Sequence, residues 1–388
     1  MLAERNAYVP ASEIRKIFNM IQGQNDVLDM TVGIPDFDTP DFIKKAGKEA
    51  IDNGFTRYTH NAGYIETREA MSLKLKRDNG IDANPINEIM MTAGGMGALL
   101  LANLVIVNPG DEVLYPDPGF VSHYSHIRLA GGIPIPVPLM KENNFGMSAE
   151  SVSELITDRT KMIVLNSPNN PTGGVTDPEE MKAIAELANE YDFYILADEA
   201  YEQFQYENEK PVFIGSFDEA IERTISIFSL SKTYAMTGWR IGAVAGPKDV
   251  IASMVKLQEH VLASPTSIAQ KAAEAAVMGP QSCIKDMTAT FRKRRDIITK
   301  GLNAIEGVEL QSPGGAFYAF PDISAFGMSS YDLVIKMLED IRVAAVHGSA
   351  FGQNGEGFIR ICYAVSTERI EETIQRMDRY LPSLLRRS

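Results

Sequence analysis

The feature of this sequence that most constrains its fold is a series of short, continuously apolar segments separated by helix-like stretches. Segments that are apolar along their whole length, and not at every second residue, are typical of strands buried on both faces of a mostly parallel sheet. A capping signal at Thr176-Asp177-Pro178 precedes the amphipathic stretch 178–192. This alternation predicts an α/β domain. Its expected strands are Glu88–Thr92, Asp111–Pro116, Lys161–Asn166, Asp192–Ala197, Thr224–Ser229 and Arg240–Gly246.

The C-terminal residues follow a different pattern, which predicts a smaller α+β domain with its own core. A basic helical stretch at 290–307 leads into the segment SPGGAFYAFPDIS. A helix near 331–340, a strand-like segment at 356–364 and a last helix from residue 368 complete this pattern.

Gly279-Pro280 marks the break between the two patterns. A chain of 388 residues is also long for a single core. We therefore expect three regions: an N-terminal segment that docks on the small domain at 1–45, a large domain at 46–284 and a small domain at 285–388.

The amino-acid composition argues against nucleic acids and membranes as binding partners of this protein. The chain has 37 basic and 51 acidic residues and a formal charge of −14, whereas nucleic-acid-binding proteins present basic faces. The most apolar run, 98–107, is far shorter than the roughly 20 residues of a membrane span. Cys283 and Cys362 lie in no CxxC motif, and the first residues lack the apolar core of a secretory signal. We expect a cytoplasmic protein that binds neither nucleic acid nor membranes.

Unusual polar or glycine-rich residues follow four of the expected strands directly. In open α/β sheets ligands bind where the loops after the strands converge, so four such loops predict one composite site. The four stretches are AGGMGA, SPNNPTGG, DEAY and LSKTYAMTGWR.

The glycines of AGGMGA open an apolar helix, where backbone N–H groups and the helix dipole favour a phosphate. Neither the complete GxGxxG pattern nor a GxxxxGK[ST] loop is present, so the run from Gly95 is no dinucleotide fingerprint. A glycine turn that merely packs a helix on a sheet is an equal alternative for this stretch taken alone.

The charged residues of the other loops have simple explanations one by one. Asp198 could be a helix cap, Lys232 a solvated lysine and Arg240 half of a surface ion pair. Together, a phosphate cradle, a buried carboxylate, a lysine and an arginine suit pyridoxal phosphate, which needs a lysine and an acidic partner for its pyridine nitrogen. Burial near other cations would keep the lysine partly neutral and therefore nucleophilic.

With these residues the sequence resembles the class I/II pyridoxal-phosphate-dependent aminotransferases of fold type I, the aspartate aminotransferase superfamily. The resemblance implies an α/β fold, with a large domain whose mostly parallel central sheet is flanked by helices and a smaller α+β domain. It also implies a ping-pong transfer of an amino group from an L-amino acid to a 2-oxo acid through a Lys232 aldimine. The motifs that carry it span nearly the whole chain: YTHNAG, NSPNNPTG, DEAYEQF, SLSKTYAMTGWRIG, GGAFYAF and FIRICYA.

The same resemblance implies roles for individual residues. Lys232 would bind the cofactor aldehyde and later move a proton, and Asp198 would pair with the pyridinium nitrogen. Asn170 and Tyr201 would hydrogen-bond the phenolic oxygen, and Phe120 would stack on the ring unless it is only a core residue. The phosphate would be held by Gly95, Met96, Ser229, Ser231 and Arg240.

Three further residues would complete the site. Tyr58 is similar to the tyrosine that reaches the phosphate from the neighbouring subunit, which implies a homodimer with shared active sites. Arg360 would bind the substrate α-carboxylate, because its planar fork matches a carboxylate. Gly33 and Asn170 would contact the same substrate, and no metal is expected.

The sequence departs from acidic-substrate relatives at two places. Met96 stands where such relatives often have a lysine, and the loop 257–270 contains no arginine. A neutral or aromatic amino acid is therefore favoured, with glutamate still possible as a donor, and Arg15 and Arg128 are cations left without a place. His123 and His126 are interpreted as structural polar positions on a helix over the site.

Two other functions share the same motifs. A carbon–sulfur β-lyase would use the same lysine and the same cofactor, so the residues do not separate it from a transferase. A non-enzymatic pyridoxal-phosphate-sensing module would need a fused DNA-binding domain, for which 45 N-terminal residues are too few.

Overall fold

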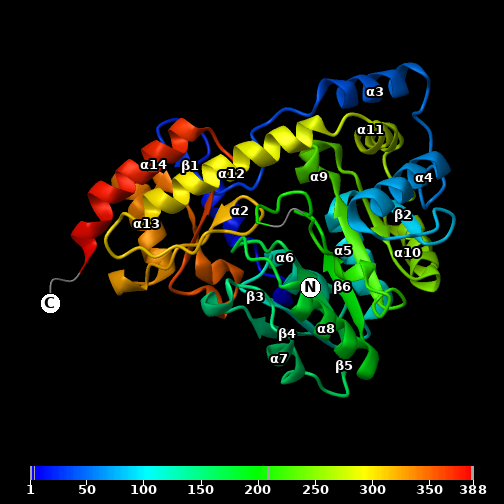
Figure 1. The fold of residues 1–388 in the computed structure, drawn as a ribbon, viewed down its shortest axis with the longest axis horizontal. Helices are drawn as coiled ribbons and strands as arrows, with labels where there is room; N and C mark the ends of the chain where they lie inside the picture. The colour runs from blue at the N-terminus through cyan, green and yellow to red at the C-terminus, as the bar shows by residue number, and fades with distance from the viewer. Residues whose placement is uncertain (1, 4, 208–209, 386–388) are drawn as a thin grey trace.

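A computed structural model describes residues 2–3, 5–207 and 210–385. Its centre is a seven-stranded sheet with the order β2-β8-β7-β6-β5-β3-β4 (Figure 1). β8 is antiparallel to both of its neighbours, and the other neighbouring strands are parallel. The mostly parallel sheet is the one predicted from the sequence. Its strands are β2 Ile89–Thr92, β3 Glu112–Asp117, β4 Ile133–Pro138, β5 Thr160–Asn166, β6 Tyr194–Asp198, β7 Thr224–Ser229 and β8 Gly242–Ala245.

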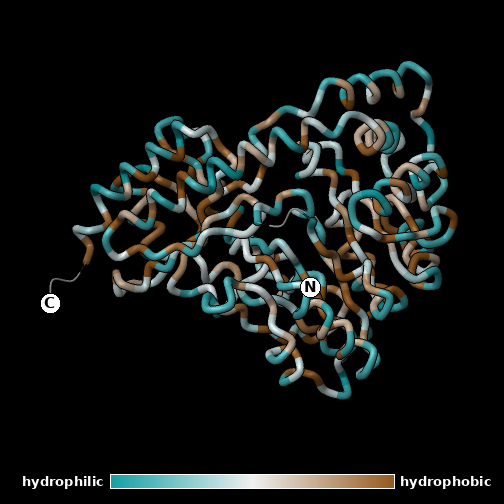
Figure 2. Tube along the Cα trace, in the orientation of Figure 1, coloured by the Kyte–Doolittle hydropathy of each residue, from teal (hydrophilic) through white to brown (hydrophobic). Residues whose placement is uncertain are grey.

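Both faces of the sheet are covered, which explains why its strands are apolar throughout. In β5, Met162 and Val164 pack with helices α5 and α10, while Ile163 and Leu165 pack on the opposite face with α8. Figure 2 shows the same arrangement, with apolar residues along the inner strands and hydrophilic residues on the outer helices. The helices of this part are α3 Asp41–Asp52, α4 Ile65–Lys74, α5 Gly94–Ile106, α6 Val121–Leu129, α7 Ala149–Ser153, α8 Pro178–Glu190, α9 Leu230–Thr233, α10 Lys248–Val261 and α11 Ser267–Met278.

The sequence pattern did not predict strand β4, whose sequence is IPIPVP. A proline has no N–H to donate, so prolines argue against a central strand. β4 lies at the end of the strand order, paired with β3. An edge position tolerates the missing donors and accounts for the difference.

The C-terminal residues build a three-stranded antiparallel sheet of order β11-β12-β9, packed with three long helices. A two-stranded parallel pair, β1-β10, lies beside it. The strands are β1 Leu28–Asp29, β9 Tyr318–Ala319, β10 Val343–Ala344, β11 Val346–His347 and β12 Ile359–Cys362, and the helices are α12 Ser282–Leu302, α13 Ser330–Ile341 and α14 Thr367–Tyr380.

The N-terminal residues, which include α1 Arg5–Tyr8 and α2 Glu13–Met20, contact both parts of the molecule. Ile17 and Met30 belong to the same buried cluster as the C-terminal helices, whereas Ile43 packs with α11. Figure 1 shows α12 as one continuous helix that extends from near α11 to α14. The boundary between 284 and 285 falls in its first turn, and the division into three regions stays a proposal. No helix in 2–3, 5–207 or 210–385 has the length and apolarity that crossing a membrane requires.

Candidate active site

Lys232 lies in the short helix α9, directly after β7, at the edge of the sheet where the parallel strands end. Its Nζ donates a hydrogen bond to the backbone oxygen of Gly33, at 2.5 Å. Burial of the amine, together with the smaller effects of the positive charges of Arg360 and Arg240, lowers the pKa of Lys232 to about 8. The structure therefore places this lysine where a neutral amine is accessible near neutral pH.

Asp198 ends β6, in register with Asn166 at the end of β5. Its Oδ2 lies 2.9 Å from Nε2 of His123, and its Oδ1 accepts the Ala200 N–H at 3.3 Å. Asp198 and His123 are both buried, so the contact between the carboxylate and the imidazole is shielded from solvent. Burial and the neighbouring His123 lower the pKa of His126 to about 4.

Arg360, in β12, is a fully buried arginine held by groups from distant parts of the chain. Its Nη1 donates to Oδ1 of Asn170 at 2.9 Å, and its Nη2 donates to the backbone oxygen of Thr31. The rings of Tyr318 and Phe351 lie 4.6 and 4.8 Å from its Cζ. Among the described residues its Nε has no hydrogen-bond partner.

Tyr318 connects the lysine and the arginine. Its hydroxyl lies 2.7 Å from the hydroxyl of Tyr201, and burial raises the pKa of Tyr201 well above its usual value. A Cβ at position 33 would lie 1.9 Å from the same hydroxyl, so only glycine fits there. Gly33 thereby brings its backbone to Tyr318 on one side and to Lys232 on the other.

A cradle for an anion lies at the start of α5. No side chain caps this helix at Ala93, so N–H groups of its first turn are free to bind an anion. Gly94 has φ +70°, and a Cβ on it would lie 2.8 Å from Nη2 of Arg240. A Cβ on Gly95 would lie 3.5 Å from Cβ of Ser229. Arginine, serine and helix amides thus lie close together, a combination of groups that suits a phosphate.

The remaining predicted residues have looser contacts. Ser231 is buried, and its N–H donates to Oγ of Ser229 at 3.3 Å. Phe120 is half-buried with its ring edge-on to His123, at 5.5 Å between centroids. The side chain of Met96 is exposed, and Tyr58 is 88% exposed. Within this chain, therefore, the structure does not bring Tyr58 into contact with the other predicted site residues.

The two unplaced arginines lie by N-terminal aromatic residues. Cζ of Arg15 is 5.5 Å from the ring of Phe18, within α2, and Cζ of Arg128 is 4.7 Å from the ring of Tyr8. Neither forms an ion pair with an acidic side chain of the described residues.

The sequence pattern did not assign site contacts to His123 or Tyr318. The sequence indicated that His123 is a structural residue on a helix over the site, but it did not predict the contact of His123 with Asp198. The signals were present, since His123 lies in a helix that follows a strand end and Tyr318 lies in the quoted GGAFYAF segment.

The arrangement as a whole fits the expected cofactor. A primary amine of lowered pKa, a buried carboxylate and an anion cradle match an aldehyde, a protonated ring nitrogen and a phosphate. A guanidinium beside them can bind a substrate carboxylate with two hydrogen bonds. Chemically, the site can bind an amino acid and move the proton on its α-carbon.

Comparison with known proteins agrees with this chemistry. Residues 25–377 match the family described as aminotransferase class I and II. The chain is 41% identical over 382 residues, 98% of both chains, to the aromatic-amino-acid aminotransferase 2 of Thermococcus litoralis. It is 42% identical, again over 98% of both chains, to an aspartate aminotransferase of Pyrococcus abyssi. The solved aromatic aminotransferase of Pyrococcus horikoshii OT3 superposes with a TM-score of 0.90 at 40% identity, covering 95% of this chain and 99% of that one.

Proposed function

The chain belongs to the class I and II aminotransferase family, and from that premise we propose that Lys232 and Arg360 form the catalytic and substrate-binding centre of its transaminase site. The protein is a pyridoxal-phosphate-dependent aminotransferase that acts on amino acids and 2-oxo acids. One observation supports the proposed centre above all. Gly33 and Tyr318 contact each other, and Lys232 contacts the first while Arg360 contacts the second.

Pyridoxal 5′-phosphate, when bound, supplies an electron sink for negative charge on the substrate α-carbon. In our proposal Asp198 holds the ring nitrogen protonated, and His123 fixes the orientation of that carboxylate. Asn170 and Tyr201 hydrogen-bond the phenolic oxygen, and Phe120 covers the ring. The phosphate is held by the amides of Gly95 and Met96 and by Ser229, Ser231 and Arg240.

Lys232 has two tasks in this proposal. Its neutral amine binds the cofactor aldehyde, and the lowered pKa supports this because a protonated amine is no nucleophile. After the substrate has bound, Nζ of Lys232 moves the proton on the substrate α-carbon. A proton-transfer group works best when its pKa lies near the working pH.

Arg360 binds the α-carboxylate of the substrate. Its hydrogen bonds to Asn170 and to the backbone of Thr31 fix the guanidinium plane, while its Nε lacks a partner among residues 2–3, 5–207 and 210–385. A buried charge without a carboxylate partner is unfavourable. An incoming carboxylate supplies what this arginine lacks, and this favours the orientation needed for reaction.

We propose a neutral or aromatic L-amino acid as the distinguishing substrate, with glutamate as a possible common donor. Met96 offers no charge to a second carboxylate, and the loop 257–270 has no arginine. The relatives do not decide this point, since those named for aromatic amino acids and for aspartate are 41% and 42% identical. The homodimer with a shared site, through Tyr58, and the cytoplasmic location are also proposals.

The proposal is tested by incubating the holoenzyme with single amino acids and 2-oxoglutarate and measuring the 2-oxo acid formed. Phenylalanine and tyrosine should react faster than aspartate. Lys232→Ala should lose transamination, whereas Lys182→Ala, which changes an exposed lysine of α8, should retain it. Wild-type turnover in a Lys232→Ala enzyme would refute the catalytic role assigned to Lys232. Pyruvate and ammonia from cystathionine at the same site would instead identify a β-lyase.

A further inference from the structure

A buried carboxylate joins the loop after β3 to a turn of the C-terminal part. Asp117 is the last residue of β3 and is buried, and no ion pair joins it to a basic side chain of the described residues. Its two oxygens instead accept backbone N–H groups, Oδ2 from Gln353 and Oδ1 from Asn354, each at 3.2 Å. The contact is therefore specific for this backbone turn and needs no countercharge.

The turn is also shaped to receive this carboxylate. Gly352 has φ +132°, a conformation that side chains rarely adopt. A Cβ on Gly352 would lie 1.9 Å from Oδ1 of Asp117 and 2.5 Å from its Cγ. Next to this contact, the N–H of Gly119 donates to the backbone oxygen of Phe351 at 2.9 Å. Glycine is thus required by the fit as well as by the backbone.

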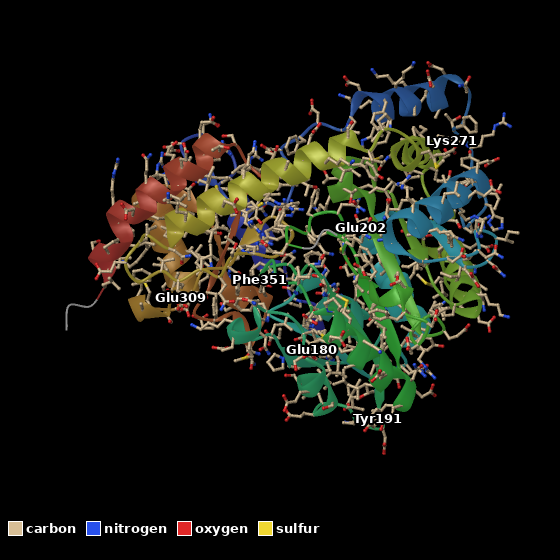
Figure 3. All side chains as sticks on the ribbon, viewed as in Figure 1. Glu180, Tyr191, Glu202, Lys271, Glu309 and Phe351 are labelled. Atoms are coloured by element: carbon tan, nitrogen blue, oxygen red, sulfur yellow. The ribbon has the colours of Figure 1, made fainter. Side chains whose placement is uncertain are left out.

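The contact reaches the substrate-binding arginine through one residue. Phe351 directly precedes Gly352, and its ring lies 4.8 Å from Cζ of Arg360. Figure 3 shows Phe351 at the junction of the C-terminal part and the central sheet. Phe120, the proposed cover of the cofactor ring, follows Gly119 in the loop that Asp117 begins. The Asp117 carboxylate, together with the Gly119–Phe351 backbone hydrogen bond, therefore holds the segment that carries Phe351 beside the segment that carries Phe120.

We propose that Asp117 is a positioning residue for substrate binding. It fixes the turn 352–354, so that Phe351 keeps the Arg360 guanidinium oriented toward the substrate α-carboxylate. The proposal rests on the proposed role of Arg360, and it adds a residue that touches neither the substrate nor Arg360.

The first test is steady-state kinetics of the Asp117→Asn holoenzyme. An amide group would place a donor against one of the two N–H groups, so the turn should loosen. We expect KM for the amino acid to rise about tenfold, with kcat changed less than about threefold, because positioning of the carboxylate is lost and the chemistry is retained. Gly352→Ala, which pushes a methyl group into Oδ1, should give the same split between KM and kcat.

Two further variants isolate the mechanism. Phe351→Leu leaves the Asp117 contacts in place and should raise KM in the same way. Gly357→Ala is the matched control, because Gly357 also has a positive φ, +87°, but the nearest atom to its Cβ would be Ser324 Cβ at 3.8 Å. This control should keep the wild-type KM even if it lowers the melting temperature.

A binding measurement separates positioning from general stability. Titration of each holoenzyme with 3-phenylpropionate, a carboxylate without an amino group, should show about tenfold weaker binding in Asp117→Asn, Gly352→Ala and Phe351→Leu. Wild-type affinity and KM in Phe351→Leu, or in a folded Asp117→Asn enzyme, would overturn the proposal. Failure of the wild-type holoenzyme to bind the carboxylate or to transaminate would instead refute the proposed function.

Discussion

At the scale of single residues, the chemistry of Lys232 follows from where its amine lies. The amine donates to a carbonyl oxygen, and no ion pair joins it to a carboxylate of the described residues. Burial disfavours its protonated form. A lysine that would be inert at neutral pH on a surface is thereby made reactive by its position after β7.

This position predicts how the apoenzyme takes up its cofactor as the pH changes. With a pKa of about 8, roughly a tenth of the Lys232 amine is neutral at pH 7 and nearly all of it at pH 9. The rate of covalent capture of pyridoxal phosphate should therefore rise about tenfold between these values, with its midpoint near pH 8.

Stopped-flow absorbance of the apoenzyme mixed with the cofactor measures that rate. Nα-acetyl-lysine under the same conditions is the control, because its amine has the ordinary pKa and should show no midpoint below pH 10. An enzyme profile that follows the control would mean that burial does not lower the pKa of Lys232.

How far the site could be predicted from the sequence depended on the kind of contact. Asp198 lies at a strand end and Asn170 and Lys232 lie within four residues of one, where a strand pattern and its following loop are both visible in the sequence. The contact of Tyr318 with Gly33 and that of Arg360 with Thr31 join chain segments about 300 residues apart, and no local pattern encodes such a pair. Tyr58 stays a prediction, because its proposed partner belongs to a second subunit.

At the scale of elements, a buried ion pair ties α4 to the turn after β6. Nζ of Lys74 donates to Glu202, and it also donates to Oδ1 of Asn79 at 2.8 Å. Asn79 donates to the other oxygen of Glu202 and ends the π-helix Leu75–Asn79 that continues α4. Figure 3 shows Glu202 between α12 and the central sheet. The Lys74 and Asn79 contacts with Glu202 therefore fix the turn that follows Asp198 and contains Tyr201.

Breaking this pair should be costly, because the remaining charge would be buried without a partner. Lys74→Met should lower the free energy of unfolding by ~3–5 kcal/mol. The double variant Lys74→Met/Glu202→Leu removes both charges and should recover much of the loss, measured by urea unfolding. Lys76→Met, which removes an exposed ion pair with Asp82, should cost about 1 kcal/mol or less. A double variant no more stable than Lys74→Met would contradict the ion-pair explanation.

The elements also show which patterns are readable from a sequence. Strands with two buried faces were predicted within one or two residues, and β7 with its exact bounds, because continuous apolar runs are a strong signal. β4 was not predicted because its prolines argue against a strand, although an edge strand tolerates them. The antiparallel direction of β8 could not be predicted from the sequence, because the side-chain pattern of a strand is the same in either direction.

At the scale of the whole molecule, large apolar side chains are exposed on the segment that carries Tyr58, on the end of α10 and at the start of α5, and the first two are joined by a hydrogen bond from the Thr59 N–H to Oγ of Ser264 at 3.4 Å. Tyr58 is 88% exposed, Val261 47%, Leu262 42% and Met96 40%. Neighbouring exposed apolar side chains are typical of a protein–protein interface. They support the proposed homodimer, in which each subunit lends Tyr58 to the site of the other.

Hybrid dimers test that arrangement. Lys232→Ala and Tyr58→Ala subunits, unfolded together and refolded, should regain activity, because one of the two hybrid sites combines an intact Lys232 with an intact Tyr58. If the hybrids are half of all dimers, about a quarter of the wild-type activity per subunit should return. The separately refolded variants are the control. If Tyr58 served its own subunit, no hybrid site would be intact and mixing would restore nothing.

The pairing of β1 with β10 has a consequence for how the protein is made. Leu28 pairs with Val343, and Ile17 and Met30 complete a core whose other residues come mainly from 287 to 381. At about 5–20 residues per second, a ribosome needs roughly 15–60 s to travel from the first of these strands to the second. During that interval the apolar residues around β1 lack part of their native core, while the central sheet can already assemble. The segment around β1 is thus among the last to complete its fold, and a messenger cut short before β10 would yield a chain with that segment left open to chaperones and proteases.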